Sequence, residues 1–138
     1  MKKAALSFIS LCAFCSLFLL LASCATAPLK IDEGLNPAEY FQRAQTAVVD
    51  RNDFKTALLY YQAFLERFPD DIQGAAAEYE IAFIHYKTGD LAKAKELFNV
   101  LLEKYKGDAA MVLPRWPEVL SRKIIEKIDA PKVAPEKK

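Results

Sequence analysis

The stretch NDFKTALLYYQAFL at residues 52–65 decides the fold, because the stretch GDLAKAKELFNVLL at residues 89–102 repeats its pattern. In both, a turn residue precedes an aspartate, and apolar side chains then recur three and four residues apart. Such spacing forms one face of an α-helix. The two stretches begin 37 residues apart, and a fixed period of this size is typical of repeat proteins. The sequence therefore predicts a repeated helical unit.

Helix-starting and helix-ending residues flank both stretches. Asn36, Pro37 and Glu39 offer a capping residue, a proline at the first helical position and an acidic third residue. Pro69 is expected to end a helix, and the Asp-Asp pair at 70–71 to cap the next one. We expect five helices, over residues 37–50, 54–68, 72–88, 91–106 and 114–128. The predicted fold class is all-α.

The repeated pattern resembles the tetratricopeptide repeat, a helix-turn-helix unit of about 34 residues. The resemblance implies a short α-solenoid with repeats over about 38–71 and 75–108 and a capping helix over 114–128. Gln45 stands where the first repeat would carry a small residue. The residues that the resemblance assigns to packing within the repeats are Ala57, Tyr61, Pro69, Ala82, Gly89, Ala94 and Phe98.

The fifth helix is expected to cover the apolar end of the solenoid, since an uncovered end would expose core. Trp116 is expected to contribute to that cover, and a ligand platform is the alternative for this residue. The apolar stripe of this helix is Trp116, Val119, Leu120, Ile124 and Ile128.

In the family that the repeats resemble, the first helix of each unit supplies partner contacts. Carried to this sequence, these positions include Gln42, Thr46, Tyr79, Phe83, Tyr86 and Lys87. Three of them are aromatic residues on one stripe of the third helix. They either pack in the core or line a groove for an extended or helical peptide, and the sequence leaves both interpretations open.

The N-terminal segment has the layout of a secretory signal. Lys2 and Lys3 precede an apolar run, and no charged residue occurs from Ala4 to Ala22. The run is near the roughly 20 residues that span a bilayer, so a retained transmembrane helix is the competing interpretation.

Leu21, Ala22, Ser23 and Cys24 resemble the lipobox of bacterial lipoproteins. The resemblance implies that residues 1–23 form a cleaved signal helix and that Cys24 carries a covalent lipid. It further implies an outer-membrane anchor facing the periplasm, with surface exposure as the alternative. We expect a linker over 24–36, a helical domain over 37–128 and an unstructured tail over 129–138.

Composition argues against several kinds of function. Without residues 1–23, the remaining 115 residues carry 17 Lys and Arg against 18 Asp and Glu, so no electrostatic case for nucleic acid exists. His85 and Ser121 are the only histidine and serine of that part, and no cysteine besides Cys24 remains. We therefore expect no enzyme, no metal site, no small-molecule substrate and no cofactor beyond the lipid.

Within lipid-anchored repeat proteins, residues 68–105 resemble the BamD (YfiO) family of outer-membrane assembly lipoproteins. The resemblance rests on Phe68-Pro69 and on Tyr86-x-x-Gly89-Asp90, although that family carries more repeats. It implies a periplasmic adaptor that binds protein partners, among them the β-barrel assembly machine. The alternatives are a pilotin-like or envelope-coordinating lipoprotein and a surface-exposed structural lipoprotein without a defined client.

Overall fold

Helices account for all regular structure in the part of the chain that the computed structural model describes, residues 31, 32 and 34–131. The α-helices are α2 (Pro37–Arg51), α3 (Phe54–Arg67), α4 (Gly74–Lys87), α5 (Leu91–Glu103) and α6 (Arg115–Asp129). Two 3-10 helices, η2 (Lys104–Lys106) and η3 (Asp108–Met111), lie between α5 and α6. The predicted all-α class is confirmed.

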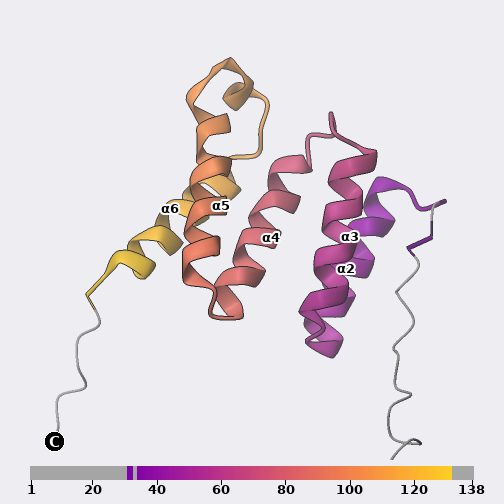
Figure 1. The fold of residues 1–138 in the computed structure, drawn as a ribbon. Helices are drawn as coiled ribbons and strands as arrows, with labels where there is room; N and C mark the ends of the chain where they lie inside the picture. The colour runs from indigo at the N-terminus through magenta and orange to yellow at the C-terminus, as the bar shows by residue number, and fades with distance from the viewer. Residues whose placement is uncertain (1–30, 33, 132–138) are drawn as a thin grey trace, which may run out of the picture. The chain divides into compact units, whose positions relative to one another are not determined.

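Helices that follow one another in the chain also pack against one another. Helix α2 pairs with α3 and α4 pairs with α5, α3 contacts α4, and α6 packs against α5 and α4 (Figure 1). The result is two helix-turn-helix units and a fifth helix at the C-terminal end. This is the predicted short solenoid of two repeats and a capping helix.

The sequence signals at the start of α2 act as expected. The Glu39 amide donates to the Asn36 side chain over 3.1 Å, and the Asn36 amide donates to the Glu39 carboxylate over 2.7 Å. This reciprocal pair satisfies two amides that the first turn of a helix leaves without partners. Helix α2 therefore begins at Pro37, as predicted.

The two repeats turn by the same device. Asn52 has a φ of 52°, and Gly89 has a φ of 88°, so each reverses the chain in the left-handed region. The next residue caps the following helix, because Asp53 accepts from the Thr56 amide over 3.0 Å and Asp90 from the Lys93 amide over 3.2 Å. The repeated turn and aspartate in the sequence thus have one structural meaning.

The core consists of two clusters of buried side chains that meet at α4. The first joins α2, α3 and one side of α4, and its large members include Tyr40, Tyr61 and Phe64. The second joins the other side of α4 with α5 and α6 around Tyr79 and Phe98. Helix α4 is covered on both sides, and its sequence is accordingly apolar around most of its circumference. Helix α2, in contrast, is apolar on one face only.

Most residues assigned to repeat packing occupy the expected positions. Ala57, Ala82, Ala94 and Phe98 are fully buried. Gln45 is exposed, and the neighbouring Ala44 is the small residue of α2 that lies in the first cluster with Ala57 and Tyr61. Gly89 is exposed and has a role in the turn, not in packing.

Two predictions at the junction of the repeats are wrong. Pro69 is exposed and follows the cap residue Phe68, so it ends α3 without packing in the core. Asp71 lies in a turn where its carboxylate accepts from the Gln73 amide over 2.8 Å, and α4 begins only at Gly74. The Asp-Asp pair therefore shapes the connection between repeats and does not cap α4.

The predicted apolar stripe of α6 is also partly wrong. Ile124 is buried and Ile128 packs against the second cluster, as expected. Trp116, however, is 42% exposed, and Val119 and Leu120 are exposed as well. Pro117 and Ser121 are fully buried and occupy the side of α6 that faces the protein instead. The tryptophan thus covers the core only in part.

Candidate functional site

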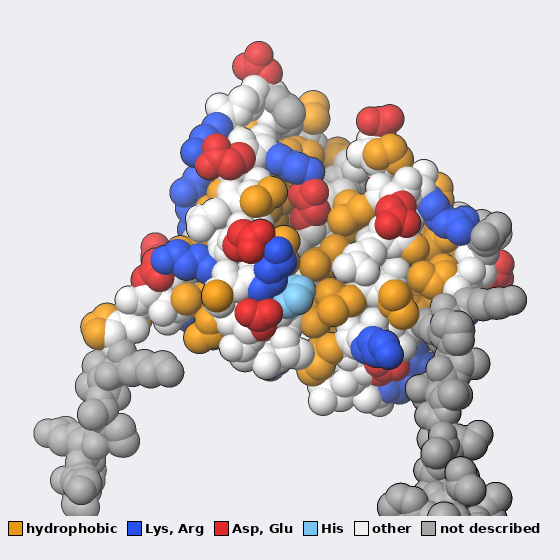
Figure 2. All heavy atoms as spheres, viewed as in Figure 1, with side chains coloured by type: hydrophobic (Ala, Val, Ile, Leu, Met, Phe, Trp, Pro, Cys, Tyr) orange, Lys and Arg blue, Asp and Glu red, His pale blue; other side chains and the backbone are white. Residues whose placement is uncertain are grey.

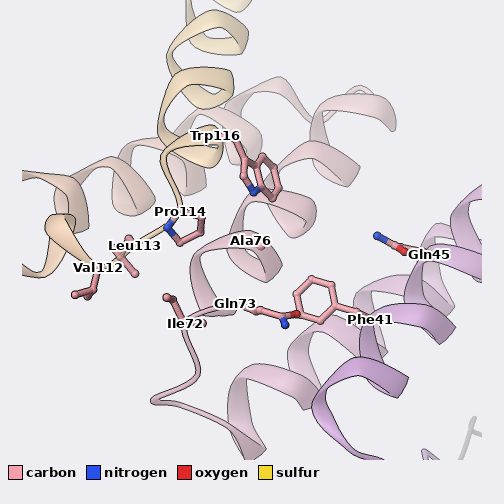
Figure 3. Close-up of a pocket in the computed structure, with 9 residues that line it drawn as sticks. All are labelled: Phe41, Gln45, Ile72, Gln73, Ala76, Val112, Leu113, Pro114 and Trp116. Atoms are coloured by element: carbon pink, nitrogen blue, oxygen red, sulfur yellow. The ribbon is translucent and has the colours of Figure 1, made fainter.

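A pocket of about 430 Å³ lies between the first helices of the two repeats and the start of α6. Figure 3 shows Phe41 and Gln45 reaching from α2 towards α4, where Ala76 lies, while Trp116 stands on the α6 side. We call this the inter-repeat pocket, and its lining residues are Phe41, Gln45, Ile72, Gln73, Ala76, Val112, Leu113, Pro114 and Trp116.

Each wall of the inter-repeat pocket is held by one repeat. On the first wall, the Phe41 ring contacts Phe64 edge-on at a centroid distance of 4.8 Å. On the second, Trp116 contacts Tyr79 edge-on at 5.1 Å, and Tyr79 in turn lies 5.6 Å from Phe98. Buried partners restrict the motion of both rings, so the walls are preformed.

The chain before α6 is fixed by a hydrogen bond next to the pocket. The buried Tyr105 hydroxyl donates to the Pro114 carbonyl over 2.8 Å. At the start of α6, Arg115 and Arg122 both pair with the buried Glu118, at 3.0 and 3.1 Å. Burial raises the pKa of Tyr105, and the Glu118 carboxylate adds to this. These contacts hold the start of α6, and with it Trp116, beside α4.

The aromatic stripe of α4 is divided between core and surface. Tyr79 is 6% exposed and belongs to the second cluster, so it is a core residue. Phe83 and Tyr86 are half-buried; the Phe83 ring stacks on Tyr79 at 5.8 Å and Tyr86 lies 5.9 Å from Phe83. Burial, with a smaller contribution from the Glu80 carboxylate, raises the pKa of Tyr79 to about 12. Of these three rings, therefore, Phe83 and Tyr86 are the ones that offer surface to a partner.

The polar residues predicted for the groove are exposed. Gln42 and Thr46 lie on α2, and Lys87 is the last residue of α4. None of the three lines the inter-repeat pocket, whereas the adjacent Gln45 does. Gln42 and Thr46 therefore flank pocket residues along α2, whereas Lys87 lies at the far end of α4 from the pocket.

The connections that precede α4 and α6 contribute pocket residues that sequence reasoning missed. Ile72 is 57% exposed and Val112 is 67% exposed, and both line the pocket beside the half-buried Leu113. The available signal was the run Met-Val-Leu-Pro at 111–114, which places apolar residues in a connection where polar ones are usual. An exposed apolar group of this kind is typical of an interaction site.

A second, smaller pocket of about 190 Å³ lies among α3, α4 and α5, where Leu65, Ile81 and Leu97 are among its lining residues. The view in Figure 2 shows apolar side chains between α3 and α4. Glu78 also lines this pocket, and its carboxylate pairs with Lys104 at 2.6 Å. This pocket belongs to the packing between the repeats.

His85 and Ser121 have separate environments. The His85 Nδ1 atom lies 3.5 Å from the Asp90 carboxylate across the turn. The Ser121 hydroxyl is buried on α6 and finds no hydrogen-bond partner among the described residues. Nor do the described side chains include a group of three or more His, Cys, Asp or Glu that could hold a metal ion.

Leu21, Ala22, Ser23 and Cys24, which carry the lipobox prediction, lie outside the described residues, as do the signal segment and most of the predicted tail. Cleavage and lipidation therefore stay predictions. Within the described part of the chain, no helix has the length and apolar character that crossing a bilayer requires.

Comparison with known proteins supports the repeat assignment. The sequence profile described as "Tetratricopeptide repeat" matches residues 48–112. An uncharacterized protein of Treponema pallidum (strain Nichols) is 33% identical over 97 residues, which cover 68% of this chain and 38% of that protein. The chain thus corresponds to well under half of that relative. No solved structure gives a significant match.

The two helix-turn-helix units of the structure lie where the sequence matches the tetratricopeptide-repeat profile, so fold and comparison agree on a short, TPR-like solenoid. Such repeats generally serve as non-catalytic scaffolds that bind other proteins. The structure shows two places that could accommodate a partner. One is the inter-repeat pocket, and the other is the exposed edges of Phe83 and Tyr86.

Proposed function

We propose that this protein is a lipid-anchored adaptor that holds protein partners at the periplasmic face of the outer membrane. The observation that carries the adaptor role is the inter-repeat pocket, where exposed apolar residues of α6 and of two connections gather beside the first helices of both repeats. Anchoring is supported by the lipobox sequence that ends at Cys24. One lipid chain binds a membrane marginally, and several chains bind it stably.

The partner surface runs from the inter-repeat pocket along α4. Phe83 and Tyr86 extend it, because their rings are stacked and half-buried and so lose little conformational freedom on binding. Rigid aromatic residues of this kind dominate the binding energy of many protein interfaces.

The more specific role that we propose is in the assembly of outer-membrane β-barrel proteins. It is supported by the resemblance of residues 68–105 to the BamD family. The described residues form two repeats and a capping helix, so α2, α4 and α6 provide the surface that would bind the assembly machine.

Affinity purification from detergent-extracted membranes tests the adaptor role. We expect the native protein to retain a stoichiometric partner and the double variant Phe83→Ala, Tyr86→Ala to lose most of it. Val100→Ala is the matched control, because Val100 is an exposed apolar residue on α5 and lies outside the inter-repeat pocket. A partner that survives the double variant, or the absence of any stoichiometric partner, would contradict the proposal.

The identity of the partner tests the specific role. Co-purifying subunits of the barrel-assembly machine would support it. A secretin or a peptidoglycan-associated partner would instead identify a pilotin-like or envelope-coordinating protein.

Anchoring is tested separately with Cys24→Ala. We expect the native chain in the outer-membrane fraction and the variant outside it, because residues 25–138 contain no cysteine to which the lipid could be attached. Metabolic labelling with a palmitate analogue gives the second measurement. An unlabelled native chain would refute lipidation while leaving the adaptor role intact.

A further inference from the structure

The lining of the inter-repeat pocket is uncharged. Its nine residues include no Lys, Arg, His, Asp or Glu. A charged group that entered would lose water and find no counter-charge there, which is unfavourable. The pocket therefore favours an uncharged occupant over a carboxylate or an ammonium group.

The pocket nevertheless has two polar groups, on opposite sides. Gln45 lies on α2, and Gln73 caps the start of α4 without a side-chain hydrogen bond to the helix. Each amide carries both a donor and an acceptor. Peptide groups present the same pair of functions, so both glutamines can bind the backbone of an extended segment whose side chain lies between them.

The size and walls of the pocket fit a side chain. Its volume of about 430 Å³ is at the lower end of the range of about 300–1,000 Å³ that is usual for ligand sites. Phe41 and Trp116 offer ring surface on two sides, and the small Ala76 leaves space between them (Figure 3). One apolar side chain with its flanking peptide groups would occupy this volume.

We infer that the inter-repeat pocket binds one uncharged apolar side chain, aromatic or branched aliphatic, from an extended segment of a protein partner. Gln45 and Gln73 bind the peptide groups on either side of it. This inference rests on the proposed adaptor function and specifies the partner's chemistry: a neutral segment with an apolar anchor, not an acidic or basic tail.

The chain contains its own probe for this site. Trp116 lines the pocket and is the single tryptophan of the sequence. Growth on 5-fluorotryptophan therefore places one fluorine at the pocket, and ¹⁹F NMR of the full-length protein in nanodiscs gives one resonance to follow. The ligands are capped pentapeptides of four alanines around a central Phe, Leu, Asp or Lys.

We expect the Phe- and Leu-centred peptides to shift the resonance saturably. The Asp- and Lys-centred peptides should require concentrations at least about tenfold higher, which is the factor that 1.4 kcal/mol of desolvation corresponds to. Equal affinity for the charged peptides, or no shift with any peptide, would overturn the inference. Broadening of the resonance by lipids with a paramagnetic headgroup would also overturn it, because Trp116 would then contact the membrane surface.

Filling the pocket from an exposed position gives the decisive variant. Gln45→Phe should abolish peptide binding, because the ring would occupy the space beside Phe41. Gln42→Phe is the matched control, since Gln42 is exposed one turn away on α2 and does not line the pocket. Circular dichroism checks that both variants keep the native helix content and thermal transition. Retained binding by Gln45→Phe would refute the site.

Affinity purification of Gln45→Phe, compared with that of the Phe83→Ala, Tyr86→Ala variant, separates this inference from the adaptor role. If Gln45→Phe still captures the partner that the Phe83→Ala, Tyr86→Ala variant loses, the pocket inference fails and the adaptor role stands. If no variant changes what the protein captures, the adaptor role fails.

Discussion

In the first repeat the aromatic rings face one another, whereas in the second they lead from the core to the surface. Tyr40 contacts Phe68 at 5.8 Å within the first cluster. In the second, the contacts run from Phe98 through Tyr79 to the half-exposed Trp116. Two units with one backbone plan thus reach the candidate site differently: the first through Phe41, which packs on Phe64, and the second through Tyr79, which packs on Trp116.

Removal of the central aromatic ring of each repeat should have the largest effect on stability. Phe64 and Phe98 are both fully buried, so Phe64→Ala and Phe98→Ala should each lower the free energy of unfolding by about 3–5 kcal/mol. Urea denaturation followed by circular dichroism measures the loss. Only changes at Phe98 should also alter the environment of Trp116, because Tyr79 lies between them.

The milder pair Phe64→Leu and Phe98→Leu keeps the protein folded for that second measurement. The ¹⁹F resonance of fluorinated Trp116 should move in Phe98→Leu and stay in Phe64→Leu. Equal shifts in both would mean that the two clusters do not differ in their connection to the site.

The two turns should respond differently to substitution. Gly89→Ala places a side chain at a φ of 88° and should cost about 1–2 kcal/mol, although no atom would meet the added Cβ within 4 Å. Asn52→Gly should change stability little, because asparagine already tolerates its φ of 52°. Gly107→Ala is the control: its φ of −112° suits any residue and its surroundings are open. A melting temperature that is lower for Gly107→Ala than for Gly89→Ala would contradict this explanation.

Opposite pH responses of one carboxyl in each repeat are the smallest effect that we expect. Hydrogen bonds from Thr56 lower the pKa of Asp53, so its stabilising contribution is present above its unfolded pKa and is lost as the pH falls through the folded one. Burial raises the pKa of Glu80, so its contribution is full at low pH and is lost as the pH rises through the raised value.

Denaturation midpoints between pH 3 and pH 7 measure both contributions. Asp53→Asn should flatten the loss of stability at the acid end, and Glu80→Gln should make the protein more stable at pH 7. A Glu80→Gln variant that is less stable at pH 7 would show that this carboxylate has a favourable role when charged.

Much of the fold was predictable because local signals determine it. The capping box at Asn36 and the left-handed residue Gly89 act within one turn of the chain, and both predicted helix limits correctly. Pro69 shows the limit of such signals, since a residue that ends a helix need not pack in the core. The all-round apolar pattern of α4 likewise follows from its central position, which no single helix reveals.

The candidate site was only partly predictable because it depends on distant contacts. Periodicity places Trp116 on an apolar stripe of α6, but α6 is oriented by Pro117 and Ser121 on its buried side. This orientation of α6 leaves the Trp116 ring between Tyr79 and solvent. Phe41 and Gln45 face it from α2, about 70 residues earlier in the sequence, so their pairing required the three-dimensional arrangement.

The division of the core at α4 has a mechanical consequence. Phe41 moves with the first cluster and Trp116 with the second, so any change in the superhelical curvature of the solenoid widens or narrows the gap between them. Leu97 packs against both clusters and so links them. An occupant of the inter-repeat pocket would therefore touch both clusters at once and tie the two repeats to each other.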